Sequence, residues 1–186
     1  MLLMRHENAT NGYFSQSVVS TGIENPENTS ANTYCIIGSV DPAMFQLPLL
    51  DGWYDLELIY DYANADRDVL RWSQSSWINE AVASVEADLS AINDSYHVDG
   101  GGGFDGLAKS SDNSTYLDGS PGHDFFYHAV ASVTEWYSFR DHEYGIPGHE
   151  TRAAYHSELW VRRGTACVCV CHCAVLCSIA EMYRYI

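Results

Sequence analysis

Apolar and polar residues alternate most clearly in two neighbouring segments near the middle of the chain. In residues 53–60, aromatic and aliphatic side chains alternate with the carboxylates of Asp55 and Glu57. In residues 69–78, Leu70 and Trp72 fall on one face of an extended chain. A period of two is typical of a strand with one buried face. The short polar stretch between the two segments predicts that they form an antiparallel hairpin.

Three further segments complete the pattern. Residues 125–133 are apolar at successive positions, which predicts a central strand covered on both faces. Residues 153–161 alternate again, and we expect them to close the sheet. Residues 79–92 are the one helical candidate, because Asn79 can act as an N-cap and apolar residues follow at spacings of three and four.

These elements predict an all-β fold, mainly an antiparallel β-sandwich with at most one short helix, over residues 33–163. Residues 1–32 are polar and show no sustained period, so we expect a loosely ordered N-terminal arm. Cys35, beside two isoleucines, is expected to be buried and unpaired. The expected core includes Leu56, Leu58, Tyr60, Leu70, Trp72, Phe126, Val130, Leu159 and Val161.

Residues 164–186 differ in composition from the rest of the chain, since they hold five of its six cysteines. A soft-metal site, a disulfide knot and a short membrane anchor are three functional interpretations. A zinc site would need a second pair of cysteines from elsewhere in the chain, which offers only Cys35. A disulfide between close cysteines of one strand is unfavourable, because neighbouring side chains point to opposite faces, and the apolar run is shorter than the ~20 residues of a spanning helix. We therefore expect an unpacked tail, or a gene-model artefact encoded by a TG repeat, and no membrane insertion.

The charge balance narrows the range of partners. The chain holds 25 Asp and Glu residues against 9 Lys and Arg, a formal net charge of -16. Such a chain repels phosphate backbones and anionic lipid headgroups, so nucleic acid is not an expected partner. Cations, or ligands bound through Ca²⁺, fit better.

Four sequons for N-glycosylation point to an extracellular, secreted protein. They begin at Asn8, Asn28, Asn93 and Asn113, all in polar, loop-like surroundings. No signal peptide is visible, because the first residues lack an apolar stretch of roughly 7 to 15 residues.

Two segments resemble catalytic motifs, but each lacks a residue that the motif requires. His149-Glu150 begins like a zinc-protease helix, but Ala153 occupies the place of the second histidine ligand. Asp118-Gly-Ser120 lacks the first glycine of a nucleophile elbow. A paired-carboxylate hydrolase stays open, because the separation of two carboxylates cannot be read from sequence. These absences favour a non-enzymatic protein.

The segment from residue 136 to residue 149 is the candidate ligand-binding site. Aromatic rings can cover the CH faces of a polyhydroxylated ligand while charged groups bind its hydroxyls. Its predicted binding residues are Trp136, Arg140, Asp141, His142, Glu143, Tyr144 and His149. Asp141, His142 and Glu143 are also candidate calcium ligands. The alternative is that Trp136 and Tyr144 only anchor the loop.

Several strings in the second half of the chain resemble extracellular animal lectin-like modules of the intelectin and fibrinogen-related type. They are residues 116–120, residues 125–130, Trp136, residues 146–148 and residues 157–161. The resemblance implies Ca²⁺-assisted glycan binding, with His142, Glu143 and His149 as the residues nearest to that pattern.

The sequence therefore leaves three hypotheses of function. The first is a non-enzymatic extracellular module that recognises a glycan or a protein ligand, with Ca²⁺ as the candidate cofactor. The second is a structural or adhesive domain of a larger extracellular protein. The third is a secreted hydrolase.

Overall fold

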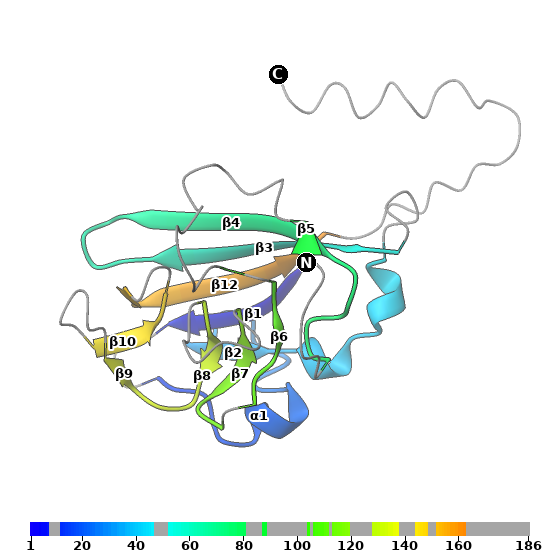
Figure 1. Ribbon diagram of the computed structural model, residues 1–186. Coiled ribbons are helices and arrows are strands. Elements are labelled where there is room, and N and C mark those ends of the chain that lie inside the picture. Colours follow the sequence, from blue (N-terminus) through cyan, green and yellow to red (C-terminus); the bar gives the residue numbers. More distant parts are fainter. Residues whose placement is uncertain are drawn as a thin grey trace, which may run out of the picture.

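The computed structural model describes residues 1–7, 12–46, 52–80, 87–88, 104, 106–111, 113–119, 128–137, 144–148 and 152–162. Within them, strands dominate and the only α-helix is one turn long (Figure 1). The helical elements are α1 (Val18–Thr21) and two 3₁₀ turns, η1 (Ile37–Ser39) and η2 (Pro42–Met44). The strands are β1 (Leu2–Glu7), β2 (Thr33–Cys35), β3 (Tyr54–Asp61), β4 (Arg67–Gln74), β5 (Ala87–Asp88), β6 (Ala108–Lys109), β7 (Thr115–Asp118), β8 (Val130–Ser132), β9 (Trp136–Tyr137), β10 (Tyr144–Pro147), β11 (Ala153–Ala154) and β12 (His156–Val161).

Six of these strands form one large antiparallel sheet in the order β2-β1-β12-β3-β4-β5. The hairpin predicted from residues 53–60 and 69–78 is confirmed as β3 and β4, which pair from Tyr54 opposite Gln74 to Asp61 opposite Arg67. Strand β12 does not lie at an edge, because it pairs with β1 on one side and β3 on the other.

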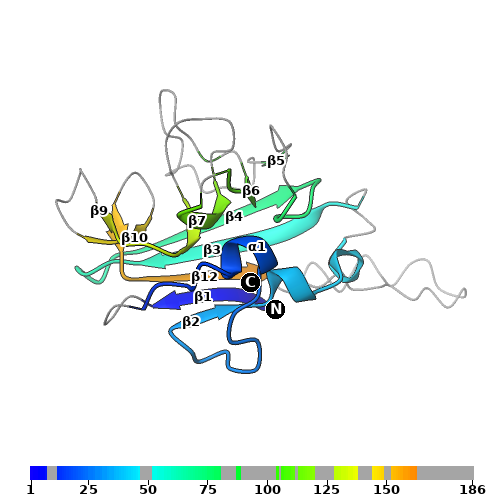
Figure 2. The same cartoon turned by 90° about the horizontal axis from the view of Figure 1, so that it is seen from below.

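Two smaller sheets, β6-β7-β8 and β9-β10-β11, cover one face of the large sheet (Figure 2). Buried residues of all three sheets, such as Leu58, Val130 and Ile146, belong to one hydrophobic core. The expected all-β, mainly antiparallel architecture with one short helix is confirmed.

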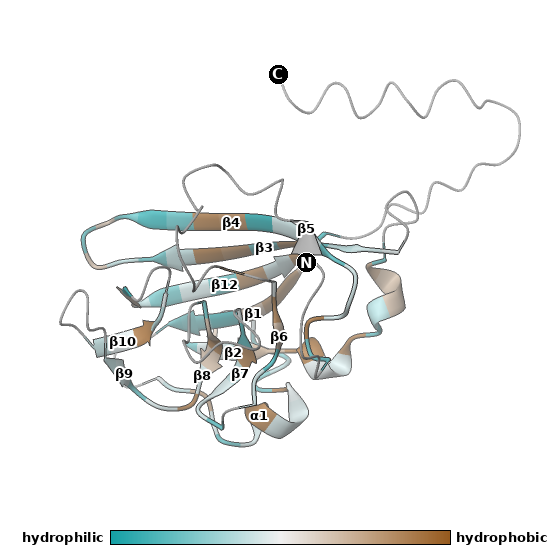
Figure 3. Ribbon diagram, in the orientation of Figure 1, coloured by the Kyte–Doolittle hydropathy of each residue, from teal (hydrophilic) through white to brown (hydrophobic). Residues whose placement is uncertain are grey.

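The covered face of the large sheet is called the inner face below. One cross-strand row on it joins Met4, Leu159, Leu58 and Leu70, and all four side chains are fully buried. Fully burying an aliphatic side chain contributes about 1.5–3 kcal/mol. Figure 3 shows the interleaved hydrophobic and hydrophilic bands along β4 that this one-sided burial produces.

The expectation of a loose N-terminal arm is wrong for residues 2–7, which form β1 inside the large sheet. A register shift between Leu2 and Met4 puts two consecutive residues, Leu3 and Met4, into the core. This irregularity interrupts the alternation of buried and exposed residues, so the sequence pattern did not predict a strand here. The strand also needs β12, which is about 150 residues away along the chain, with Glu7 opposite His156.

The predicted helix over residues 79–92 is wrong where the structure describes it, since Ala87–Asp88 is strand β5. These two residues pair with Ser73 and Gln74, and that tertiary pairing overrides the local helical spacing. The other residues of the segment beyond Glu80 lie outside the described part. The observed helix, α1, ends at Thr21 and is followed by Gly22 as its C-cap, whose φ of 63° favours glycine.

The core prediction is confirmed for eight of its nine residues, and Phe126 lies outside the described residues. Cys35 is buried, as expected, and has no disulfide partner within the described chain. Its thiol donates to the carbonyl oxygen of Gly22 at 3.1 Å, and burial raises its pKa to about 12. The Cys-rich tail, residues 164–186, also lies outside the described residues.

Candidate functional site

The segment predicted to bind ligand is described only in part. Trp136 lies in β9 and Tyr144 in β10. Five of the predicted residues lie outside the described ranges: Arg140, Asp141, His142, Glu143 and His149. The calcium ligands proposed among them therefore stay a prediction.

The described part of this segment is a β-hairpin that carries exposed aromatic rings. Tyr137 and Tyr144 face each other across the two strands, with ring centroids 4.9 Å apart. Tyr144 is 66% exposed, and Trp136 is partly buried without belonging to the core. Neither residue belongs to the hydrophobic core of the described chain.

A second candidate lies on the opposite face of the large sheet, called the outer face here. Because side chains alternate along a strand, β3 points Asp55, Glu57, Ile59 and Asp61 outward, while Tyr54, Leu56, Leu58 and Tyr60 point inward. Strand β4 places arginines opposite two of them, since Glu57 pairs with Arg71 and Asp61 pairs with Arg67. The outer face is thus a ladder of opposite charges.

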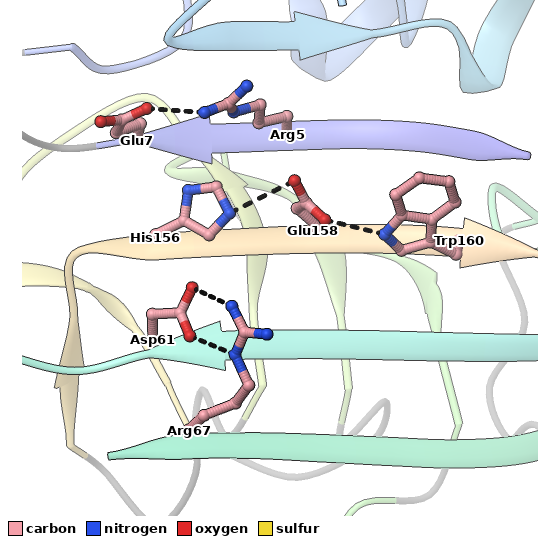
Figure 4. Close-up of polar contacts among 7 residues, drawn as sticks. All are labelled: Arg5, Glu7, Asp61, Arg67, His156, Glu158 and Trp160. Carbon is pink, nitrogen blue, oxygen red and sulfur yellow. Dashed lines mark hydrogen bonds and ion pairs between the residues drawn. The ribbon is translucent and has the colours of Figure 1, made fainter. Parts of the chain in front are cut away.

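Figure 4 shows the part of this ladder around β12. Arg67 binds both carboxylate oxygens of Asp61, at 2.5 and 2.9 Å, in a bidentate pair. His156 lies 3.4 Å from Glu158, and Glu158 in turn accepts a 2.9 Å hydrogen bond from the indole N–H of Trp160. These contacts hold Trp160 in one orientation among charged neighbours.

A cleft of about 160 Å³ opens on the outer face next to Trp160. Two ion pairs flank it: Arg162 lies 3.0 Å from Asp55, and Arg71 lies 2.5 Å from Glu57. Both arginines are largely exposed. The complete lining, called the Trp160 cleft below, is Asp55, Leu56, Glu57, Arg71, Trp160, Val161 and Arg162.

The carboxylates of the outer face differ in their electrostatics. Burial raises the pKa of Asp55, and Arg162 opposes that shift. The pKa of Asp61 is lowered, chiefly by the hydrogen bonds that Arg67 donates to it. Asp61 is therefore held in its charged form more firmly than Asp55.

Among the side chains that the structure describes, four arginines lie on the outer face against five carboxylates, so this part of the face is nearly neutral although the chain as a whole is strongly acidic. They are Arg5, Arg67, Arg71 and Arg162, and Glu7, Asp55, Glu57, Asp61 and Glu158. Such a surface offers donors and acceptors in similar number, which suits an uncharged polar ligand better than an ion.

The sequence prediction did not find the Trp160 cleft. A signal for it was available, because the outward positions of the two alternating segments hold Asp55, Glu57 and Trp160. The missing information was which strands are neighbours. Residues 53–60 and 153–161 lie far apart in sequence, yet Glu57 and Trp160 are direct cross-strand partners.

Comparisons with protein-family models, curated proteins and solved structures found no match to this chain. Within the described ranges, no group of three or more histidine, cysteine or acidic residues is placed to hold a metal ion. The described helices are also too short to cross a membrane. Of the four sequons, Asn28 and Asn113 are exposed, whereas Asn8 and Asn93 lie outside the described residues.

Proposed function

We propose that this protein is a non-enzymatic extracellular recognition module that binds an uncharged glycan in the Trp160 cleft. One observation carries the proposal: an indole ring, which donates a hydrogen bond to Glu158, lines a cleft together with two arginine–carboxylate pairs. Aromatic faces cover the CH surface of a sugar, and charged groups at the rim bind its hydroxyls.

The polar groups around the cleft support hydrogen bonding in both directions. Arg71 and Arg162 place guanidinium groups at the rim of the cleft, and a guanidinium carries five N–H donors. Asp55 and Glu57 supply acceptor oxygens at the same rim. A sugar hydroxyl, which both donates and accepts, matches this arrangement.

Binding in this cleft needs no calcium in the proposed mode, since its carboxylates are paired with arginines rather than gathered around a cation. A calcium-assisted site at Asp141, His142 and Glu143, next to Tyr144 of the exposed hairpin, is the other location that the proposal allows for a glycan. The two locations differ in their response to chelation.

A secreted glycoside hydrolase is a second candidate, favoured by one observation. Asp55 and Glu57 are two residues apart on the same outward strand face, and both line the cleft. Burial raises the pKa of Asp55, as the general acid of such an enzyme requires. Against it, each carboxylate is tied to an arginine.

The test is a glycan array of neutral, sialylated and sulfated sugars, probed with the full chain with and without a chelator. We expect neutral glycans to bind in both conditions. Trp160→Ala should weaken binding at least about tenfold, a free-energy change of ~1.4 kcal/mol. Tyr144→Ala, in the exposed hairpin, is the matched control and should leave the affinity unchanged.

Other outcomes contradict the proposal in distinguishable ways. Binding that is lost with the chelator and with Tyr144→Ala, but not with Trp160→Ala, would move the site to the hairpin. Absence of binding to every glycan would reject the recognition function. Release of reducing sugar that both Asp55→Asn and Glu57→Gln abolish would establish the hydrolase instead.

A further inference from the structure

The turn that precedes β2 holds one of the four sequons, Asn28-Thr29-Ser30, in a defined conformation. The backbone N–H of Asn28 donates to the carbonyl oxygen of Asn25 at 3.0 Å, and Ala31 N–H donates to the carbonyl oxygen of Asn28 at 3.0 Å. The side-chain oxygen of Asn28 accepts from the backbone N–H of Ser30 at 3.1 Å. The amide group of Asn28 is thereby fixed by its oxygen.

The nitrogen of that same amide is left available. Within the described chain, no hydrogen bond engages Nδ2 of Asn28 or the hydroxyl of Ser30, and all three residues of the sequon are exposed. Nδ2 is the atom that carries the sugar in an N-linked glycan, and the hydroxyl two residues later completes the recognised motif. Both groups reach solvent from one short turn.

The sequon at Asn113 differs in its second half. Asn113 itself is exposed, and its carbonyl oxygen accepts a hydrogen bond from the side chain of Gln16 at 3.0 Å. Thr115, however, begins β7 and is only 3% exposed, with its hydroxyl oxygen buried. A transferase that must engage this hydroxyl cannot reach it in the folded chain.

We propose that Asn28 is an N-glycosylation site, accessible even after folding, and that Asn113 can be modified only before β7 is in place. The donor is a polyprenyl-diphosphate-linked oligosaccharide. A bond forms between Nδ2 and the anomeric carbon of the first sugar, the bond from that carbon to the diphosphate breaks, and the polyprenyl diphosphate leaves. The proton displaced from Nδ2 goes to a base of the transferase.

The position of Asn28 keeps its glycan away from the ligand site proposed above. The turn leads directly into β2, an edge strand of the large sheet (Figure 2). The residues that line the cleft come from β3, β4 and β12 and from Arg162, which follows β12. Strand β1 separates β2 from β12. The inference rests on the proposed extracellular location but not on the cleft, so modification and glycan binding can fail separately.

Two measurements on the full chain test it. In the first, the chain is directed into the secretory pathway of eukaryotic cells, and its peptides are analysed by mass spectrometry before and after enzymatic removal of N-glycans. In the second, unglycosylated folded chain is incubated with an oligosaccharyl transferase and its lipid-linked donor. We expect the Asn28 peptide to be modified in both, and the Asn113 peptide to be unmodified in the second.

Ser30→Ala is the informative variant, because it removes the sequon but keeps the hydrogen bond from the Ser30 backbone to Asn28. It should abolish the modification while leaving the thermal unfolding temperature and cleft binding unchanged, and Ser30→Thr should restore it. An Asn28 peptide without glycan in either measurement overturns the assignment. Equal modification of Asn113 in the folded chain overturns the accessibility argument.

Discussion

The two faces of the large sheet are built from the same strands, yet one is buried and apolar and the other is partly exposed and mostly polar. On the inner face, Leu58 lies in a row of fully buried aliphatic residues. On the outer face, the adjacent residue Glu57 pairs with Trp160 and Arg71 in a partly exposed polar row. The inner face supplies most of the stability through burial, while the outer face contributes little stability and holds the cleft at which we propose ligand binding. Neighbouring residues of one strand therefore have different roles: one side chain packs in the core, and the next lines the proposed binding cleft.

The largest effect should come from removing a side chain of the inner row. Leu58→Ala deletes a fully buried leucine between Leu159 and Leu70 and should lower the free energy of unfolding by about 2–5 kcal/mol. Urea unfolding measures it, with Glu57→Ala as the neighbouring outer-face control. Equal losses from the two variants would contradict the division between the faces.

A pH effect should come from His6 on the inner face. The ring is buried against Phe14, its Nε2 donates to the carbonyl oxygen of Gly12 at 2.7 Å, and burial lowers its pKa to about 4. Because the unfolded chain binds the proton more tightly, with a pKa near 6.5, stability is full above pH ~6.5 and is lost as the pH falls towards 4. The loss should reach about 3 kcal/mol.

The matched comparison for this effect is His6→Gln, which keeps a side-chain donor but cannot be protonated. The unfolding free energy, followed from pH 7 to pH 4, should fall less in the variant than in the parent chain. The same slope in both proteins would show that carboxylates, and not His6, govern the acid response.

An intermediate effect is expected from a buried polar bridge. The side-chain oxygen of Gln74 accepts from the backbone N–H of Leu107 at 2.9 Å, and its nitrogen donates to the carbonyl oxygen of Leu107 at 2.8 Å. Gln74→Leu leaves both backbone groups without these bonds and should cost about 1–3 kcal/mol. Hydrogen exchange should show faster exchange at Leu107, and unchanged protection there would refute the role of the bridge.

The smallest effect should come from the outer face itself. Arg67→Ala removes the bidentate pair with Asp61, which lies at an exposed end of the ladder. Exposed ion pairs contribute little to the free energy of unfolding, and salt screens them. Thermal unfolding in low and high salt measures this contribution. A loss comparable with that of Leu58→Ala would show that the outer ladder also holds the fold together.

Much of the large sheet could be predicted from local pattern. The alternation through Leu56 and Leu58 gave the hairpin of β3 and β4, and the burial of Leu159 and Val161 was also foreseen. The candidate site was harder to predict. Of the predicted hairpin residues, Tyr144 is exposed and Trp136 is partly buried. The cleft beside Trp160 was not anticipated, because it needs three strands in register.

The sequence by itself determined which side of each regular strand faces the core, because the period of two is a local property of an extended chain. It also placed Cys35 in the interior from its apolar neighbours. Only the tertiary structure decided which strands are adjacent. It brought β1 from one end of the chain against β12 from the other, and it turned Ala87–Asp88 into an edge strand against a helical spacing. Pairing between distant segments depends on the free energy of the whole sheet, and no local pattern records it.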